Sequence, residues 1–525
     1  MAADAEIPTG LRRWAIVLAS TLGTAAYDFT WTVVGIALPP MQGTFSATPD
    51  QVAWVMTGFI VGSAMMMACI GFITSHMSRK TLFLVSLAAY TVTLIGCGLS
   101  GTLTEIVVWR FLQGLVGAPL IPIGQAIAVD AFPARQHGKA TSIWGIAIVA
   151  GGAFGPVGGG MLIEHLGWPW IFYITAPFSI AAIFAVWFVV PEVPREPARK
   201  LDGFGFVVLM VAIVAIQMAL SRGERQDWFD SPEIIAEALI AGIAVYLFVV
   251  HTCIAKQPFI NRALFQNWNY AVGLVFLVVF GAVIILPNIM LPLMLAEVSG
   301  YSAIETGYLM IPRGFGVVLG LIVIGQIDEF VDPRIVITIG LVFVVFTAWE
   351  MAQWTVNLSG WDVAWTNFLQ GIASGAMWVP VSALALGTLP RRFQSEGYSV
   401  FYLQFDIGSA IGVAGVIAIH TRNSQANHAV LTEHVTPFNE LLRYRNMPEI
   451  WDLSEAWGRA ALDLEVSRQA AMIAYNNSFL LVAMGTVALL PLVFLFRPPR
   501  HDHDYEAAEQ RLKPHIEQPG RLPEQ

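Results

Sequence analysis

Long apolar runs constrain this chain more than any other feature of its sequence. A helix that crosses a lipid bilayer needs about 20 consecutive, mostly apolar residues. Fourteen runs of that kind, bounded by charges or by clusters of glycine and proline, lie at 14–38, 51–73, 81–99, 105–129, 140–163, 168–190, 204–221, 233–254, 270–295, 304–326, 334–354, 362–388, 398–420 and 477–496. The sequence therefore predicts an all-α membrane protein with fourteen transmembrane helices.

The composition argues against most other classes of protein. Only 12% of the 525 residues are charged and 56% are hydrophobic, whereas soluble domains carry roughly 25% charged residues. These values argue against a soluble enzyme, a disulfide-rich secreted scaffold and a disordered chain. The sequence has no metal-ligand cluster, nucleotide-binding loop or nucleophile motif, so we expect no enzyme, no cofactor and no metal site. It also has no run of lysine and arginine that would predict nucleic-acid binding.

The basic residues predict the orientation of the helices. Nineteen of the 28 lysines and arginines lie in the loops and the tail that would share a side with the N-terminus. The short loops of the other side hold only Arg222 and Arg225. Because cytoplasmic loops are enriched in lysine and arginine, we expect both termini in the cytoplasm. The segment 421–475 would then lie on the outer face, where its apolar spacing predicts one or two amphipathic helices.

An ionisable residue inside a membrane span is costly and is therefore a candidate for function. From those inside the predicted spans we expect four to serve proton coupling, and they are Asp28, Arg110, Arg313 and Asp406. A carboxyl group removed from water binds protons more tightly, so Asp28 could load and release a proton as its access alternates. The alternatives are a carboxylate that faces an aqueous cavity or caps a kinked helix, and an arginine that only bonds to backbone carbonyls.

Polar and aromatic residues in the same spans predict a cavity that suits amphipathic molecules. The candidates that would line this cavity are Tyr27, Trp31, Gln113, Asn288 and Gln404. For any one of them alone, packing between helices is the competing interpretation.

Glycines crowd around a proline in the predicted span at 140–163. Pro156 removes a backbone hydrogen-bond donor, and glycine lets neighbouring helices approach closely. This density predicts a hinge between two gating states, made of Gly151, Gly155, Pro156, Gly159 and Gly160. In a generic membrane helix such glycines would serve packing alone.

The loop between the second and third predicted spans ends in basic residues. We expect Gly71, Arg79 and Lys80 to form a cytoplasmic gate, because the two charges could pair with carboxylates or helix C-termini of the other half of the chain. Ordinary anchoring of this loop at the cytoplasmic surface is the alternative.

Several of these segments, in this order, resemble the major facilitator superfamily. The segment from Arg110 to Pro119 resembles the arginine motif of the family's fourth span, and Gly155-Pro156 with Gly159-Gly160 resembles the antiporter motif of its fifth. The match is closest to the fourteen-span drug:proton antiporters of the EmrB/QacA type, and within them to EmrB-like multidrug efflux pumps. It covers about 10–497 of the chain.

The chain departs from this family at three places. Thr30 stands where the family's first span carries an aspartate, and Asp28 lies two residues earlier, about 200° around an ideal helix. Ser75 stands at an aspartate position of the loop between spans two and three, and Phe405-Asp406 stands where some relatives carry an arginine. These departures allow a rewired proton coupling or a different coupling ion.

The resemblance implies two six-helix bundles, at 10–192 and 263–497, with two inserted helices at 203–254 and a cytoplasmic tail at 498–525. In such a fold the cargo binds near the midplane, between halves that rock to alternate access. The implied function is a proton-coupled secondary active exporter, an antiporter, of hydrophobic or amphiphilic drugs and toxic compounds across a bacterial inner membrane. The implied partners are a periplasmic adaptor, which would contact 421–475, and an outer-membrane channel.

Two other functions stay open at the level of the sequence. The exporter could carry one dedicated metabolite, such as a siderophore or a fatty acid. Alternatively, the chain could be a membrane receptor or scaffold that transports nothing, and the charges inside its spans would then be dispensable.

Overall fold

The structure is built from helices. The computed structural model describes residues 10–133, 136–192, 200–328, 330–390, 393–435, 451 and 455–497, and no β-strand occurs among them. The α-helices are α1 (Gly10–Phe45), α2 (Pro49–Val52), α3 (Trp54–His76), α4 (Arg79–Leu99), α5 (Leu103–Gly117), α6 (Leu120–Asp130), α7 (His137–Leu166), α8 (Trp170–Val189), α9 (Gly203–Arg222), α10 (Pro232–Ile254), α11 (Arg262–Gln266), α12 (Trp268–Ile284), α13 (Leu286–Glu297), α14 (Ala303–Ile327), α15 (Pro333–Met351), α16 (Gly360–Leu386), α17 (Gln394–Glu433) and α19 (Ala456–Leu495). Two short 3-10 helices, η2 (Glu224–Gln226) and η3 (Trp228–Asp230), join α9 to α10.

Most of the predicted membrane spans coincide with long apolar helices of the structure. Within the described residues, twelve helical segments are long and apolar enough to cross a membrane, by length and composition. They coincide with twelve of the predicted ranges, and the other two ranges, 14–38 and 140–163, lie on α1 and α7. These helices have 36 and 30 residues, which is more than the roughly 20 that a span needs. The structure is thus compatible with fourteen spans but does not confirm that number.

Several hydroxyl residues are buried along α1, which packs on α6, α7 and α8. Most of their hydrogen bonds stay within the helix: the Thr21 hydroxyl donates to the carbonyl of Val17 at 2.9 Å, and the Thr30 hydroxyl donates to that of Ala26 at 3.0 Å. Bonds of this kind satisfy a polar group inside an apolar bundle. A helix that protein surrounds can therefore be less apolar than one that faces lipid.

Two of the predicted spans contain a break at a proline. α5 ends at Gly117 and α6 begins after Pro119, while α13 begins one residue before Pro287. Proline lacks a backbone N–H and its ring clashes with the carbonyl four residues earlier, so a helix ends or bends there.

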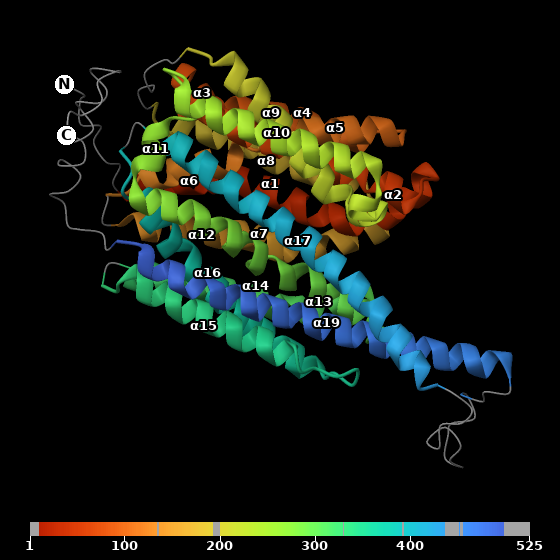
Figure 1. Cartoon of the computed structure of the whole chain (residues 1–525). Coiled ribbons are helices and arrows are strands. Elements are labelled where there is room, and N and C mark those ends of the chain that lie inside the picture. Colours follow the sequence, from red (N-terminus) through yellow and green to blue (C-terminus); the bar gives the residue numbers. More distant parts are fainter. Residues whose placement is uncertain are drawn as a thin grey trace.

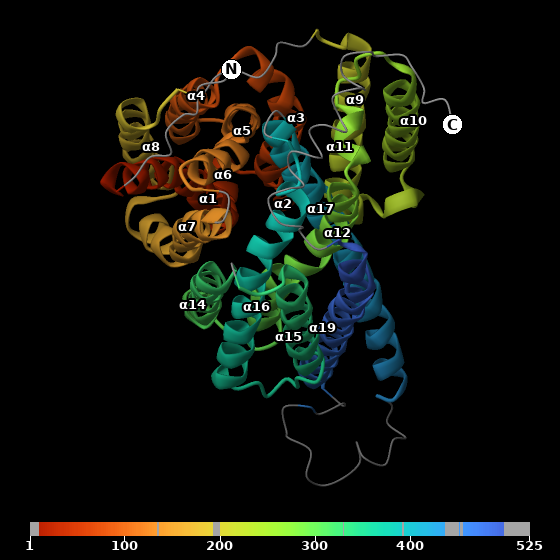
Figure 2. The ribbon, with the colours of Figure 1, turned by 90° about the vertical axis from the view of Figure 1, so that its left-hand side faces the viewer.

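The helices form two sets that repeat one packing pattern. In the first set α1 packs on α7, α3 on α5, and α4 on α8; in the second, α12 packs on α17, α14 on α16, and α15 on α19. The partners occupy the same order along the chain in both sets, which is the pattern of an internal repeat. Figure 2 shows the two sets from one end, with α9 and α10 beside them. The domain boundaries at 10–192, 203–254 and 263–497 stay a prediction.

The helices α17 and α19 extend beyond the other helices (Figure 1). Each has 40 residues, or about 60 Å at 1.5 Å per residue, twice the thickness of the hydrocarbon core. Their outer parts pack along each other, and His428 Nε2 lies 3.1 Å from Asp463 Oδ1. This mutual packing keeps a polar stretch helical outside the apolar run.

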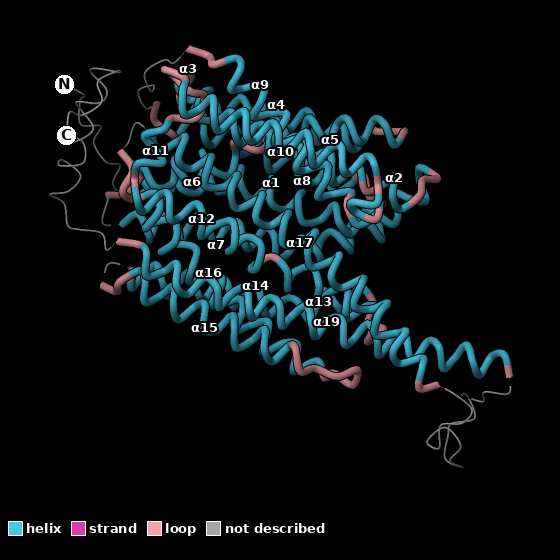
Figure 3. Tube along the Cα trace, in the orientation of Figure 1, coloured by secondary structure: helices cyan, strands magenta, loops and turns pink. Residues whose placement is uncertain are grey.

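We predicted one or two amphipathic helices in the segment 421–475, and its described residues are indeed mostly helical. Most of its described residues are direct continuations of α17 and α19, and Figure 3 shows unbroken helix up to the tip of this projection. Residues 436–450 and 452–454, and the predicted cytoplasmic tail 498–525, lie outside the described residues.

Candidate functional site

Asp28 lies midway along α1, with 18 residues before it and 17 after it in that helix. It is half-buried, and within the described part of the chain its carboxylate makes no hydrogen bond and no ion pair. Tyr27, the preceding residue, is buried and its hydroxyl lies 3.1 Å from Ser63 Oγ on α3. Asp28 thus combines mid-helix depth with a carboxylate that no described residue holds in place.

The predicted cavity residues of α1 belong to an aromatic cluster. The ring of Tyr27 lies 5.5 Å from that of Phe59 and 5.9 Å from that of Tyr90, and Trp31 stacks on Phe59 at 5.4 Å. Trp31 is half-buried, so it can present one edge to a bound molecule. The cluster gives the middle of the first half a rigid aromatic wall.

Arg110 is fully buried on α5, and its partners are an amide, a backbone carbonyl and a ring. Its Nη1 donates to Gln113 Oε1 at 2.6 Å and its Nε donates to the carbonyl of Val55 at 3.3 Å. The guanidinium carbon lies 4.1 Å from the centroid of the Phe59 ring, a cation–π contact. Arg110 makes no ion pair with Asp28, although Tyr90 lies within electrostatic range of both.

Arg313 is the buried arginine of the second half. It is 7% exposed on α14, its Nη1 donates to Gln370 Oε1 on α16, and its Nη2 donates to the carbonyl of Ile284 at 3.4 Å. Arg313 and Asp406, both candidates for proton coupling, form no ion pair with each other. Asp406 is half-buried on α17, and Tyr27 of the first half lies within its electrostatic range.

The other two cavity candidates lie on the second set of helices. Asn288 on α13 and Gln404 on α17 are both half-buried. Neither side chain makes a hydrogen bond within the described residues, so both amides stay available to a ligand. Gln113, by contrast, is fully buried and its Oε1 is occupied by Arg110.

The predicted gate residues divide between two roles. Arg79 bonds across the halves, because its Nε donates to Ser395 Oγ of α17 at 2.8 Å while its Nη1 pairs with Asp130 at 2.6 Å. Gly71 of α3 also faces α17: a Cβ there would come within 2.7 Å of the Glu396 side chain. Lys80 donates to the carbonyl of Trp187 at 2.9 Å and so stays within the first half.

Further contacts close the same end of the molecule, which we call the basic end and define by Arg79, Asp130 and Ser395. The Tyr402 hydroxyl of α17 donates to Gln125 Oε1 of α6 at 2.6 Å, and both residues are buried. On the opposite seam α7 packs on α14. The two halves are therefore in contact along both seams near the basic end, and Figure 1 shows the two sets of helices diverging toward the opposite end.

Two glycines of the predicted hinge, Gly155 and Gly159, pack closely against α1. A Cβ on Gly159 would overlap the side chain of Val33 on α1, and one on Gly155 would come within 3.2 Å of it, whereas Gly160 has open space. α7 continues as one helix through this stretch. The side chains of Gly151 and Pro156 lie outside the described residues, and the hinge itself stays a prediction.

Sequence reasoning overlooked Gln125, Gln370 and Tyr402. Gln370 had an available signal, because 110–114 reads Arg-Phe-Leu-Gln-Gly and 367–371 reads Asn-Phe-Leu-Gln-Gly. The hydrogen bond between Gln125 and Tyr402 joins residues 277 positions apart, and no local sequence pattern predicts it.

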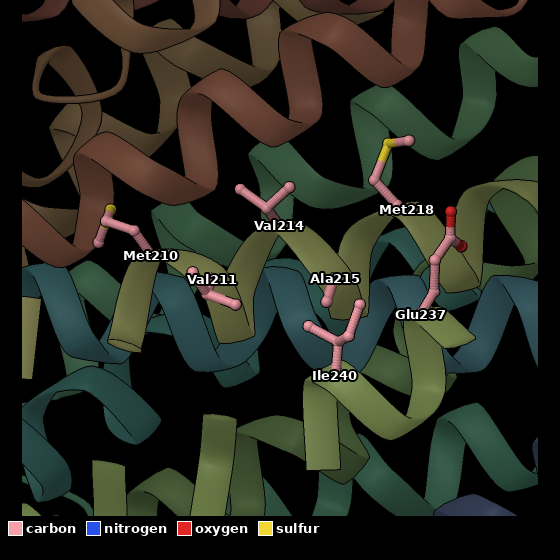
Figure 4. A pocket seen from close by; sticks show the side chains of 7 residues that line it. All are labelled: Met210, Val211, Val214, Ala215, Met218, Glu237 and Ile240. Atoms are coloured by element: carbon pink, nitrogen blue, oxygen red, sulfur yellow. The ribbon is translucent and has the colours of Figure 1, made fainter. Parts of the chain in front are cut away.

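A shallow apolar pocket of about 410 Å³ lies between α9 and α10, away from these residues (Figure 4). Methionine and aliphatic side chains line it, and Glu237 stands at one end, where its Oε1 accepts a hydrogen bond from Arg222 at 2.8 Å. We place the candidate site at the aromatic and arginine residues of the two halves instead. Among the described residues no cluster of three or more metal-binding side chains occurs.

Comparison with known proteins shows which molecules this chain is similar to. A profile described as Major Facilitator Superfamily matches residues 20–419. The chain is 28% identical to the multidrug export protein EmrB of Haemophilus influenzae over 92% of this chain and 96% of that one. It is 27% identical to EmrB of Escherichia coli K12 over 92% and 95%, and 27% identical to the fatty acid resistance protein FarB of Neisseria gonorrhoeae over 90% and 93%.

Solved structures show the same fold at low sequence identity. A double tryptophan mutant of XylE superimposes with a TM-score of 0.63 and 12% identity, covering 95% of this chain and 98% of that one. The human organic anion transporter MFSD10 superimposes with a TM-score of 0.59 and 12% identity, covering 91% and 100%.

Proposed function

The chain belongs to the Major Facilitator Superfamily, and from that premise we propose that it is a proton-coupled antiporter. It would export hydrophobic or amphiphilic drugs and toxic compounds across a bacterial inner membrane. Family membership together with multidrug-export relatives indicates a multi-pass transporter and not an enzyme. These relatives align over more than nine-tenths of this chain, which supports export as the activity of the whole molecule.

The proposed proton coupling is supported by two carboxylates that have no bonding partner among the described residues. Asp28, midway along α1, and Asp406, in the first third of α17, are both half-buried, and no described residue bonds to either carboxylate. A carboxyl group in that position can bind a proton in one state of access and release it in the other. Thr30, which stands at the family's aspartate position, has a hydroxyl that does not ionise near neutral pH, so it offers no titrating group; it is fully buried and bonds to its own backbone.

Alternating access is supported by the contacts between the halves. These contacts hold the basic end together, and we assign that end to the cytoplasm because most lysines and arginines belong to loops there. The described structure then corresponds to a state closed toward the cytoplasm. Release of the bonds of Arg79 and Tyr402 would let the halves rock and open that end.

The projection of α17 and α19 supports the proposed partners. It extends from the end opposite the basic end (Figure 1), which is the periplasmic side in this orientation. The outer parts of these two antiparallel helices would offer a surface for a periplasmic adaptor that leads to an outer-membrane channel.

The test is transport by purified protein in proteoliposomes with an imposed pH gradient, measured as efflux of a fluorescent dye. We expect Asp28→Asn or Asp406→Asn to abolish gradient-driven efflux, because an amide binds no proton. Glu350→Gln is the matched control, since Glu350 lies one residue before the end of α15 and should leave efflux intact. Coupled efflux that survives both aspartate substitutions would refute the assigned coupling.

One relative favours a second candidate, a dedicated exporter of one metabolite. The FarB protein, 27% identical to this chain, is named for fatty acid resistance. A deletion strain that becomes sensitive only to fatty acids would favour this alternative, and one that becomes sensitive to several unrelated drugs would favour multidrug export.

A further inference from the structure

The helices α5 and α16 carry the same short sequence at the same place in the repeat. Arg110-Phe-Leu-Gln113-Gly114 on α5 matches Asn367-Phe-Leu-Gln370-Gly371 on α16 at every position except the first. Both helices are the fourth span of their set, and α5 packs on α3 as α16 packs on α14.

Glycine contacts fix how the two helix pairs correspond. A Cβ on Gly114 would overlap the backbone carbonyl of Phe59 on α3, and a Cβ on Gly371 would overlap that of Arg313 on α14. Arg313 therefore occupies the position in the second half that Phe59 occupies in the first.

A reciprocal pair of contacts gives the same register. A Cβ on Gly62 would overlap the carbonyl of Phe111, and a Cβ on Gly316 would overlap the carbonyl of Phe368. Gly62 follows Phe59 by three residues, as Gly316 follows Arg313.

The first residues of the two sequences also make equivalent contacts. Arg110 donates to the carbonyl of Val55 at 3.3 Å, and its Nη2 lies 4.0 Å from the sulfur of the next residue. Asn367 donates to the carbonyl of Leu309 at 3.5 Å, and its Nδ2 lies 3.9 Å from the sulfur of the next residue. Asn367 is therefore the counterpart of Arg110.

In the second half the arginine lies on α14, the neighbour of α16, and not on α16 itself, but its partner is again the glutamine of the shared sequence. Arg110 donates to Gln113 Oε1 from α5 itself, whereas Arg313 donates to Gln370 Oε1 from α14. Because each arginine must donate, each glutamine turns its Oε1 toward the guanidinium, which leaves its Nε2 free. Both Gln113 and Gln370 are 0% exposed, and both Nε2 atoms lack a hydrogen-bond partner.

The two centres differ in how their positive charge is stabilised. Arg110 lies over the ring of Phe59. In the second half Arg313 itself stands at the position of Phe59, so the equivalent ring is missing there. Within the described residues Arg313 contacts no carboxylate and no aromatic face. An unpaired buried charge is costly. Here Arg313 donates only to neutral acceptors, Gln370 Oε1 and the carbonyl of Ile284, and the buried Gln370 Nε2 is a donor without an acceptor.

We propose that Arg313 and Gln370 form a subsite for the carboxylate of an anionic amphiphile. The inference rests on the proposed export function and names a class of cargo for it. A carboxylate accepts a charge-assisted bond from the guanidinium and a second bond from the amide. Leu309 and Met310, beside Asn367, offer an apolar surface to the aliphatic part of the same molecule.

The test compares octanoate with octanamide, a neutral molecule of the same shape, by titration calorimetry on the full-length protein in lipid nanodiscs. We expect the wild-type protein to bind octanoate at least tenfold more tightly than octanamide. Arg313→Gln should remove this preference. The double substitution Arg313→Phe with Asn367→Arg rebuilds the arrangement of the first half, in which a ring already stabilises the guanidinium, and should not restore it.

A fourth protein guards against a folding defect. Gln370→Glu supplies an internal carboxylate to Arg313, so we expect it to raise the melting temperature and to abolish the preference for octanoate. Equal affinity of the wild-type protein for the two compounds overturns the subsite, and so does a preference that survives Arg313→Gln or Gln370→Glu.

The binding assay also separates this inference from the function on which it rests. A wild-type protein that prefers octanoate but exports no compound from proteoliposomes supports the subsite and overturns the exporter. A protein that exports a dye but does not prefer octanoate overturns the subsite alone.

Discussion

At the scale of single residues, the four ionisable side chains that we assign to proton coupling fall into two groups. Asp28 and Asp406 are half-buried carboxylates that no described residue holds. Arg110 and Arg313 are buried and are each fixed by a glutamine and a backbone carbonyl. A free carboxylate can exchange its proton, whereas a bonded guanidinium supplies a fixed positive field. We therefore give the titrating role to the aspartates and the electrostatic role to the arginines.

How far residue-level chemistry could be predicted depends on the distance along the chain. Arg110 and Gln113 are three residues apart on one helix, so helical spacing alone makes them neighbours. Arg313 and Gln370 are 57 residues apart, and their contact depends on how α14 packs against α16. Both arginines could be identified from the sequence, but the partners of Arg313 could be identified only from the packing of the helices.

A residue-scale prediction concerns Asp202, which caps α9 outside the apolar run. Its carboxylate accepts bonds from the backbone N–H of Gly205 at 3.0 Å and of Phe259 at 3.1 Å, and it lies 2.9 Å from His251 Nε2. Burial alone would raise the pKa of the Asp202 carboxyl, but these bonds outweigh burial and lower it. We expect Asp202→Asn to destabilise the protein by about 1 kcal/mol at pH 7, because the amide can still cap α9 but makes no charge-assisted bonds.

The sign of the pH dependence follows from the lowered pKa. A carboxyl whose pKa is lower in the folded state stabilises that state above its unfolded pKa, of about 3.9. This stabilisation is lost as the pH falls through the folded pKa, so the difference in melting temperature between the wild-type protein and Asp202→Asn should shrink below about pH 4. Glu164→Gln, an exposed acid-to-amide change, is the control. A difference that is independent of pH would contradict the assignment.

At the scale of helices, the close approach of α7 to α1 yields a matched pair of substitutions. Gly159 has no room for a side chain because Val33 lies against it, whereas Gly158, the residue before it, has open space within 4 Å. We expect Gly159→Val to destabilise the protein by at least about 1 kcal/mol, the usual cost of overpacking, and to impair dye efflux. Gly158→Val should change the thermal stability in detergent much less. Equal effects would show that the approach of the two helices does not depend on this glycine.

The helices themselves were largely predictable, since apolar runs of the right length have few alternatives in a membrane. The prediction was wrong where apolarity ends before the helix does. α17 continues beyond its predicted range of 398–420 to Glu433, and α19 begins at Ala456, well before its predicted range of 477–496. These polar extensions are stabilised by packing on each other, which a pattern read along one segment does not contain.

At the scale of the whole molecule, the bond between Tyr402 and Gln125 joins the two halves in a buried place. Removal of the hydroxyl leaves Gln125 Oε1 without that donor, at a cost of about 1 kcal/mol or more. Because the bond is present only when the basic end is closed, Tyr402→Phe should shift the population about fivefold toward the state that is open at that end.

This shift can be measured as a distance between spin labels at the basic end. Cysteines introduced at Pro191 and Phe330, both exposed, would carry the labels in a background without Cys69, Cys97 and Cys253. Tyr402→Phe should enlarge the fraction of long distances, while Tyr246→Phe, at an exposed tyrosine of α10, should not. An unchanged distribution in Tyr402→Phe would mean that the hydroxyl does not latch the halves.

A deletion in the projection of α17 and α19 would test transport and adaptor binding separately. His428 and Asp463 are within 3.1 Å of each other across the two helices, so a short glycine–serine linker can replace residues 429–462 without moving the helices that remain. If the projection binds an adaptor, the shortened protein should still drive dye efflux in proteoliposomes but should no longer protect cells from the drug. Loss of both activities would instead make the projection part of the transporter's own stability. Retention of both would leave the adaptor without a binding surface there, because the transporter core would suffice for resistance.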